Sequence, residues 1–175
     1  LTRIAILDRM SAPMCEAVAA EPEAAAFLDQ LLLDTPILIV AEHEDWYRLH
    51  PLVRDFLLSR FEQLGVPEQR ELHGRACRWF ADREQFPEAA SHALAAGDEA
   101  LAQAYAAKSL WILRSQGKVA EAQAWLERIP DAVIAADVNL RLIAAWAMAL
   151  GERNAEAFRI ARDVLHDPAV DDQTQ

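Results

Sequence analysis

The sequence predicts a mainly α-helical protein that contains one short β-hairpin. Most of the 175 residues lie in alanine-rich segments with apolar side chains at helical spacing, and only five residues are glycine. Residues 37–41 form the one short, continuous β-branched run, which is the composition of a buried strand. Two glycines, Gly117 and Gly151, lie 34 residues apart in the helical part, and this spacing is the period of tetratricopeptide-type (TPR) helical repeats.

The first 64 residues predict three short helices, a hairpin and a closing helix. A helical tail covers residues 2–7, Ser11 opens the second helix as its N-cap, and Pro36 ends the third. The hairpin follows, with strands at 37–41 and 46–49 around a polar turn at 42–45. A further helix begins after His50 and ends before Gly65 and Pro67. This order is the winged-helix pattern, so we expect a winged-helix regulatory domain over residues 1–64.

Beyond Gly65 the pattern predicts antiparallel helical hairpins. Helices at 101–115 and 119–128 would turn at Gly117, and helices at 138–150 and 154–165 would turn at Gly151. An earlier pair would bury Leu72, Ala76, Trp79, Phe80, Ala89, Ala90, Ala93 and Leu94. Ala122 and Ala157 hold matching positions after the two glycines, where small side chains let helices cross closely. We therefore expect a degenerate TPR-like superhelical repeat over residues 65–175.

Three tryptophans of the repeat region allow two interpretations. Trp111, Trp125 and Trp146 lie at helical spacing among alanines, which favours a place in the core. The alternative is that they line a ligand surface, and the sequence does not identify a ligand.

Composition bears on the compartment and on the partners. The net charge is −11, and residues 1–64 have five arginines against eleven acidic residues, so direct DNA binding by the winged helix is only a weak alternative. Cys15 and Cys77 match no disulfide framework or metal spacing, which suits a reducing compartment. No signal peptide or membrane-length apolar run is visible. We expect a cytoplasmic protein with no membrane partner.

The sequence predicts no catalytic or metal site. The histidines (His43, His50, His73, His92 and His166) are not at metal-ligand spacing, and no glycine-rich phosphate loop or activated nucleophile occurs. The acidic groups 42–45 and 167–172 suit solvated segments. We therefore expect that the chain is no enzyme and that it binds no cofactor by itself.

His50 is the one candidate site residue. It stands where a strand ends and a helix begins, and there an imidazole N–H could donate to a phosphate oxygen of a neighbouring module. A structural histidine that caps or packs at this junction is the other interpretation.

Residues 46–57, Trp-Tyr-Arg-Leu-His-Pro-Leu-Val-Arg-Asp-Phe-Leu, resemble the hallmark that follows the wing in MalT-like, LuxR-type ATP-dependent activators. These belong to the STAND class of signalling ATPases. The run is also similar to the Met-His-Asp motif of plant immune receptors, with Leu49 and Pro51 in place of the methionine and the aspartate. Residues 5–18, 72–98 and 125–130 are similar to further segments of the MalT-like family, so the resemblance covers almost the full chain.

The resemblance implies that His50 contacts the β-phosphate of ADP and holds a resting state. ATP or ADP would then belong to the parent protein, and the partners would be its upstream nucleotide-binding module and a small-molecule inducer or inhibitory protein. DNA would be read only by a C-terminal domain that is not in this chain. The chain, which starts at Leu1, would be an internal regulatory fragment. A TPR-like adaptor with no nucleotide switch is the alternative function.

Overall fold

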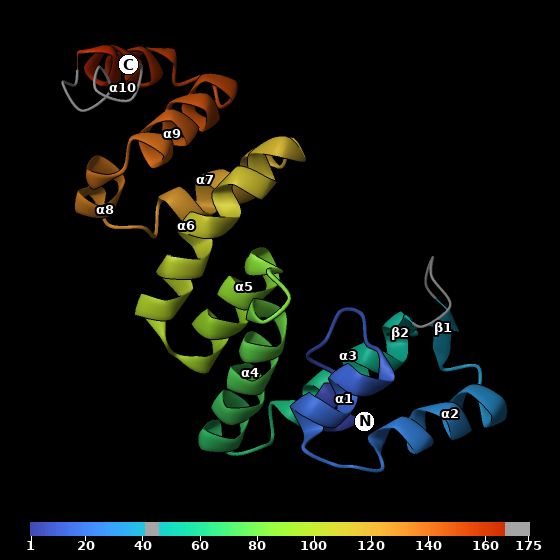
Figure 1. Cartoon of the computed structure of the whole chain (residues 1–175). Coiled ribbons are helices and arrows are strands. Elements are labelled where there is room, and N and C mark those ends of the chain that lie inside the picture. Colours follow the sequence, from blue (N-terminus) through green and yellow to red (C-terminus); the bar gives the residue numbers. More distant parts are fainter. Residues whose placement is uncertain (41–45, 167–175) are drawn as a thin grey trace. The chain divides into compact units, whose positions relative to one another are not determined.

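The computed structural model describes residues 1–40 and 46–166, and packing divides the chain into two compact units. Unit 1 comprises Leu1–Glu99 and unit 2 comprises Ala100–Gln175. Figure 1 shows that helices dominate both units and that the hairpin lies in unit 1. The predicted fold class, mainly helical with one small hairpin, is confirmed.

Unit 1 begins with three short helical elements, of which α1 is the central one. These are the 3₁₀ helix η1 (Thr2–Ile4), α1 (Ala12–Ala19) and α2 (Ala24–Asp34). Ser11 is the N-cap residue of α1, as predicted, although its hydroxyl makes no capping hydrogen bond. Helix α1 contacts η1, α2 and α4, and its Met14, Cys15 and Val18 are fully buried. The core of unit 1 therefore forms around α1.

The hairpin pairs β1 (Leu38–Val40) with antiparallel β2 (Tyr47–Leu49), so this prediction is confirmed. The predicted turn at 42–45 lies outside the described residues. Met10 extends the ladder, because its N–H and C=O exchange hydrogen bonds of 2.8 Å with those of Tyr47.

The prediction of a buried first strand is wrong. Leu38 and its partner Leu49 are buried, whereas the side chains of Ile39 and Val40 are 46% and 59% exposed. The sheet has only two strands, so it is too small for both of its faces to be covered by the core. A β-branched composition by itself therefore does not show that both faces of the strand are buried. The strand leaves the core after Leu38.

Three longer helices complete unit 1: α3 (Pro51–Phe61), α4 (Val66–Ala81) and α5 (Phe86–Ala96). Helix α4 packs against both α1 and α5. The residues predicted to line α4 and α5 (Leu72, Ala76, Trp79, Phe80, Ala89, Ala90 and Ala93) are buried, and Leu94 is half-buried. Because α4 covers α1, unit 1 extends to Glu99. The boundary after residue 64 between winged helix and repeats stays a prediction.

Unit 2 contains the helices of both predicted pairs and one helix that was not predicted. The first pair is α6 (Glu99–Ser115, starting at the last residue of unit 1) and α7 (Val119–Leu126), and the second is α9 (Val138–Leu150) and α10 (Asn154–Leu165). The short helix α8 (Asp131–Ala136) follows Pro130. Asp137 then caps α9, because its carboxylate accepts hydrogen bonds of 2.8 and 3.2 Å from the N–H groups of Asn139 and Leu140.

The tryptophans and glycines of unit 2 follow the repeat only in part. Trp125 is buried and Trp146 is half-buried, but Trp111 is 60% exposed, so its predicted place in the core is wrong. Helix α6 buries Leu110 and Leu113 instead, and the Arg114 guanidinium lies over the Trp111 ring.

Gly117 has φ +69°, which favours glycine, whereas Gly151 has an ordinary φ of −92°. Only the first turn needs glycine for its backbone.

In the part of the chain that the structure describes, every helix is too short or too polar to span a bilayer.

Candidate functional site

The backbone of His50 is fixed on both sides at the junction of β2 and α3. Its N–H donates to the Ile37 carbonyl oxygen at 2.8 Å, and its own carbonyl accepts from the Arg54 N–H at 2.9 Å. His50 is the N-cap residue of α3, and Pro51 stands at the first helical position. Proline there is preorganised for a helix start, because its ring fixes φ and its missing N–H would have had no helical partner. Pro51 therefore helps to fix the backbone at the start of α3, directly after His50.

The imidazole of His50 faces solvent. The residue is exposed, and its side chain makes no capping hydrogen bond to α3. No hydrogen bond joins its ring nitrogens to the described residues of the chain. The structural interpretation required a capping or packed ring, so this geometry favours the alternative, in which the ring nitrogens are available to a group outside the chain. Its contact with ADP stays a prediction.

Arg54 adds positive charge one turn into α3, and the sequence interpretation had not singled it out. Residues four apart lie on the same face of a helix, so Arg54 follows His50 along that face. The Arg54 Nε atom is buried and has no hydrogen-bond partner among the described residues. The N-terminus of α3 contributes a positive partial charge at the same place. The exposed histidine and the helix terminus together suit a phosphate group, and the half-buried Arg54 adds a positive charge one turn away.

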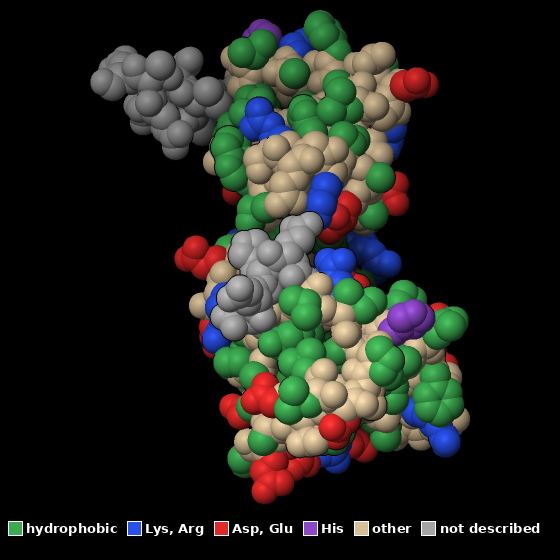
Figure 2. All heavy atoms as spheres, turned by 90° about the vertical axis from the view of Figure 1, so that its right-hand side faces the viewer, with side chains coloured by type: hydrophobic (Ala, Val, Ile, Leu, Met, Phe, Trp, Pro, Cys, Tyr) green, Lys and Arg blue, Asp and Glu red, His purple; other side chains and the backbone are tan. Residues whose placement is uncertain are grey.

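Large apolar side chains are exposed on the elements next to His50. Leu52 and Phe56, in the first two turns of α3, are 74% and 58% exposed, and Ile39 and Val40 of β1 are also exposed. Figure 2 shows hydrophobic side chains gathered on the side of unit 1 that carries the hairpin. Exposed apolar groups of this size commonly mark an interaction surface.

The structure brings together two histidines that the sequence analysis had treated separately. The Nδ1 atoms of His73 (α4) and His92 (α5) are 2.9 Å apart, and the rings of Phe61 and Phe80 lie against them. Burial lowers the pKa of both, and the neighbouring His73 helps to lower the pKa of His92 to about 4. Within residues 1–40 and 46–166, no group of three or more His, Cys, Asp or Glu side chains could hold a metal ion.

The two cysteines are separate free thiols. Both Cys15 and Cys77 are buried, and burial is the main reason that the pKa of Cys15 rises to about 12. A thiol with so high a pKa is a poor nucleophile at neutral pH. His166 is exposed, with its Nδ1 at 2.7 Å from the Arg162 carbonyl oxygen, and His43 lies outside the described residues.

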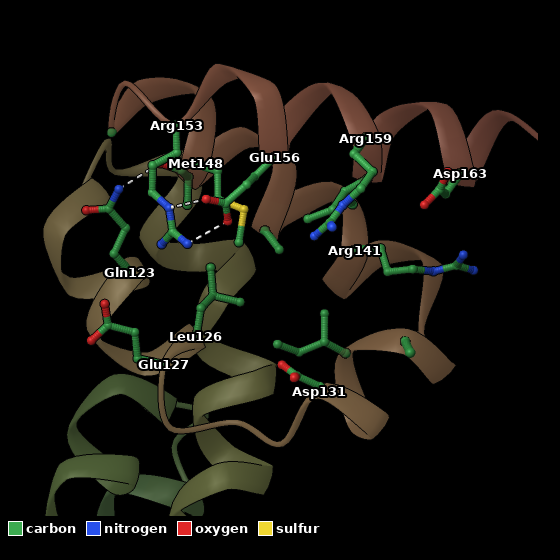
Figure 3. Close-up of a pocket in the computed structure, with 16 residues that line it drawn as sticks. Gln123, Leu126, Glu127, Asp131, Arg141, Met148, Arg153, Glu156, Arg159 and Asp163 are labelled. Atoms are coloured by element: carbon green, nitrogen blue, oxygen red, sulfur yellow. Dashed lines mark hydrogen bonds and ion pairs between the residues drawn. The ribbon is translucent and has the colours of Figure 1, made fainter.

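A cavity in unit 2 is the second candidate site. It has a volume of about 800 Å³ and lies between α7, α8, α9 and α10. Figure 3 shows Arg159 of α10 and Asp131 of α8 among the side chains around it, with Arg153 just before α10 and Glu127 just after α7. Cavities of 300–1,000 Å³ are of the size that binds small molecules. No spacing in the sequence had predicted this cavity, because its charged residues come from four helices.

Comparison with known proteins supports the interpretation of unit 1. Residues 1–70 match the family described as the MalT winged helix domain. The serine/threonine-protein kinase PknK of Mycobacterium tuberculosis is 37% identical over 113 residues, which are 65% of this chain and 10% of the kinase. The HTH-type transcriptional regulator MalT of Klebsiella pneumoniae is 31% identical over 132 residues, which are 74% of this chain and 14% of the regulator.

The element order and these matches define the class of the N-terminal part: it is a winged-helix domain of the kind found in regulatory proteins. More particularly, it is a MalT-like winged helix. The chain spans 10–14% of the length of the curated relatives named above.

Proposed function

We propose that the chain is an internal regulatory segment of a LuxR-type, ATP-dependent transcription activator of the STAND class. The observation that supports this proposal most is the exposed imidazole of His50, held on a fixed backbone within a MalT-like winged helix. In this proposal the segment is cytoplasmic, catalyses no reaction and transmits a signal between other modules of the same chain.

The winged helix would act as a lid on the upstream nucleotide-binding module. Bound ADP would supply a phosphate oxygen as acceptor, and His50 would donate a hydrogen bond to it. Arg54 and the N-terminus of α3 would strengthen this contact, because both favour negative charge. The exposed side chains of Leu52 and Phe56 would pack against the module and exclude water.

The helical hairpins would form the start of a TPR-like sensor arm. An inducer or inhibitory protein that binds this arm changes the resting state only if it prefers one arrangement of the lid. A preference of a few kcal/mol is enough to change the population usefully. DNA would be bound by a C-terminal domain outside this chain, which agrees with the acidic charge of the winged helix.

A reporter assay in the intact protein tests the proposal. The variant His50→Ala should raise transcription in the absence of inducer, because the resting state loses its nucleotide contact. The matched control is His166→Ala, which removes an exposed histidine from unit 2 and should leave the inducer requirement unchanged. If His50→Ala keeps the full inducer requirement, the lid mechanism is wrong.

A TPR-like adaptor is the second candidate, and the charged cavity between the hairpins of unit 2 favours it. An adaptor of this kind would bind a peptide or protein without any nucleotide switch. The gene sequence upstream of Leu1 separates the two candidates. A phosphate-binding loop encoded there supports the switch, and a start codon directly before Leu1 supports the adaptor.

A further inference from the structure

Charged side chains of both signs line the cavity of unit 2. Some of its charged side chains neutralise each other: Arg153 pairs with Glu156 at 2.6 Å. Another is engaged outside the cavity, since Asp163 lies 3.4 Å from Arg162. These contacts leave the lining with fewer charged groups that are available to a ligand.

Arg159 and Asp131 are two such available groups. Neither makes an ion pair or a side-chain hydrogen bond with the described residues, and both line the cavity. In Figure 3 the Arg159 side chain extends from α10 into the space above α8, where Asp131 projects from the opposite wall. Arg159 and Asp131 therefore place one cationic and one anionic group on separate helices, and Arg141 and Glu127 are further charged residues of the lining.

Part of the cavity lining is aliphatic. The apolar lining consists of Leu126, Ile134, Ala135, Ala144, Ala147, Met148 and Ile160. The lining offers no aromatic ring on which a sugar or a nucleobase could stack. An aliphatic ligand body fits this surface better than a planar or a strongly hydrated one.

We infer that this cavity binds a zwitterionic small molecule with an aliphatic body, such as a free amino acid or a short peptide. Its carboxylate would pair with the Arg159 guanidinium, which accommodates two parallel hydrogen bonds. Its ammonium group would pair with the Asp131 carboxylate. A doubly anionic ligand would face Asp131 and a doubly cationic one would face Arg159, so each would meet a like charge.

The regulatory meaning of this ligand rests on the proposed function, because it would be the signal that the sensor arm receives. The binding itself does not depend on a nucleotide or on His50. Binding to this chain alone can therefore succeed or fail independently of the lid mechanism.

Isothermal titration of the 175-residue chain tests the inference. The probes are L-leucine, leucyl-leucine and trileucine, and each is compared with its N-acetylated and its C-amidated form. The variants are Arg159→Gln and Asp131→Asn. The control is Arg114→Gln, which removes an exposed arginine of unit 2 that is not in the cavity lining.

We expect at least one free zwitterion to bind and its affinity to fall about tenfold in each cavity variant, but not in Arg114→Gln. N-acetylation or C-amidation of the probe should likewise lower its affinity for the unmodified chain about tenfold. The probe that binds best distinguishes an amino acid from a peptide. The inference is overturned if none of the three zwitterions binds, if blocked probes bind equally well, or if Arg159→Gln leaves the affinity unchanged.

Discussion

His73 and His92 show how burial changes what a histidine can do. Their Nδ1 atoms face each other at 2.9 Å, so one must donate and the other accept. Two neutral rings, or one neutral and one charged ring, satisfy this contact, but two charged rings would oppose two N–H groups. Because burial lowers both pKa values, the neutral pair is the form that the folded chain favours.

Acid should therefore destabilise unit 1 through this pair. A histidine with a lowered pKa binds its proton more readily in the unfolded chain, so stability is fully present above pH 6.5 and is lost as the pH falls toward 4. The contribution of His92 to this loss should be about 2 kcal/mol by pH 5. Urea denaturation at several pH values measures it. The variant His92→Phe keeps a ring against Phe80 and should lose less stability in acid; an identical loss in both proteins would contradict this explanation.

At the scale of residues, only part of each candidate site could be predicted from the sequence. The junction of His50 was predictable, since a change from strand to helix period marks it. The unpartnered Nε of Arg54, the His73–His92 contact and the placement of Arg159 and Asp131 in the lining of one cavity were not. Each depends on which helix faces which, and a single sequence does not contain that information in a local pattern.

At the scale of elements, Gly151 is required for a different reason than the repeat suggested. Its φ is ordinary, but a methyl group there would collide with the Gln123 side chain from α7. The Gln123 Nε2 donates to the Ala147 carbonyl oxygen at 2.8 Å and so joins α7 to α9. The glycine makes room for a contact between helical pairs.

A double-mutant cycle should reveal this contact. Gly151→Ala should displace Gln123 and lose its hydrogen bond, which offsets the gain of about 0.4–1 kcal/mol that alanine brings by restricting the unfolded chain. In a Gln123→Ala background only the gain remains, so the coupling energy should be about 1 kcal/mol. Chemical denaturation of the four proteins provides it. Strictly additive effects would show that Gln123 is not the reason for Gly151.

In the hairpin, substitutions at buried positions should lower the free energy of unfolding more than substitutions at exposed positions. Leu49→Ala removes a buried side chain and should cost about 2–4 kcal/mol. Val40→Ala changes an exposed side chain and should alter stability by no more than about 0.5 kcal/mol. Thermal or urea unfolding distinguishes the two. Equal losses would mean that the β1 strand is buried after all.

At the scale of the whole molecule, helix α4 determines where the first compact unit ends. The sequence located this helix correctly and predicted which of its residues are buried, because a periodic apolar stripe is a local pattern. It did not show that α4 packs against α1, more than fifty residues earlier. The helices on either side of Gly117 and Gly151 were likewise predictable. The short helix α8, which begins directly after Pro130, was not predicted.

Two fragments test the extent of unit 1. Residues 1–99 retain α4 and α5 and should unfold cooperatively, with helical circular dichroism close to that expected from the structure. Residues 1–64 lack the helix that covers α1 and would expose Met14, Cys15 and Val18 to water. This shorter fragment should show no cooperative transition. An equally stable transition in both fragments would contradict the role given to α4.

The lid mechanism makes its most direct prediction for the release of ADP from the intact protein. With a fluorescent ADP analogue and an excess of unlabelled ADP, stopped-flow mixing gives the dissociation rate of the nucleotide. His50→Ala should release ADP about tenfold faster than the wild type, since it loses one hydrogen bond to a charged phosphate, while His166→Ala should match the wild type. An unchanged release rate in His50→Ala would show that His50 does not hold the nucleotide.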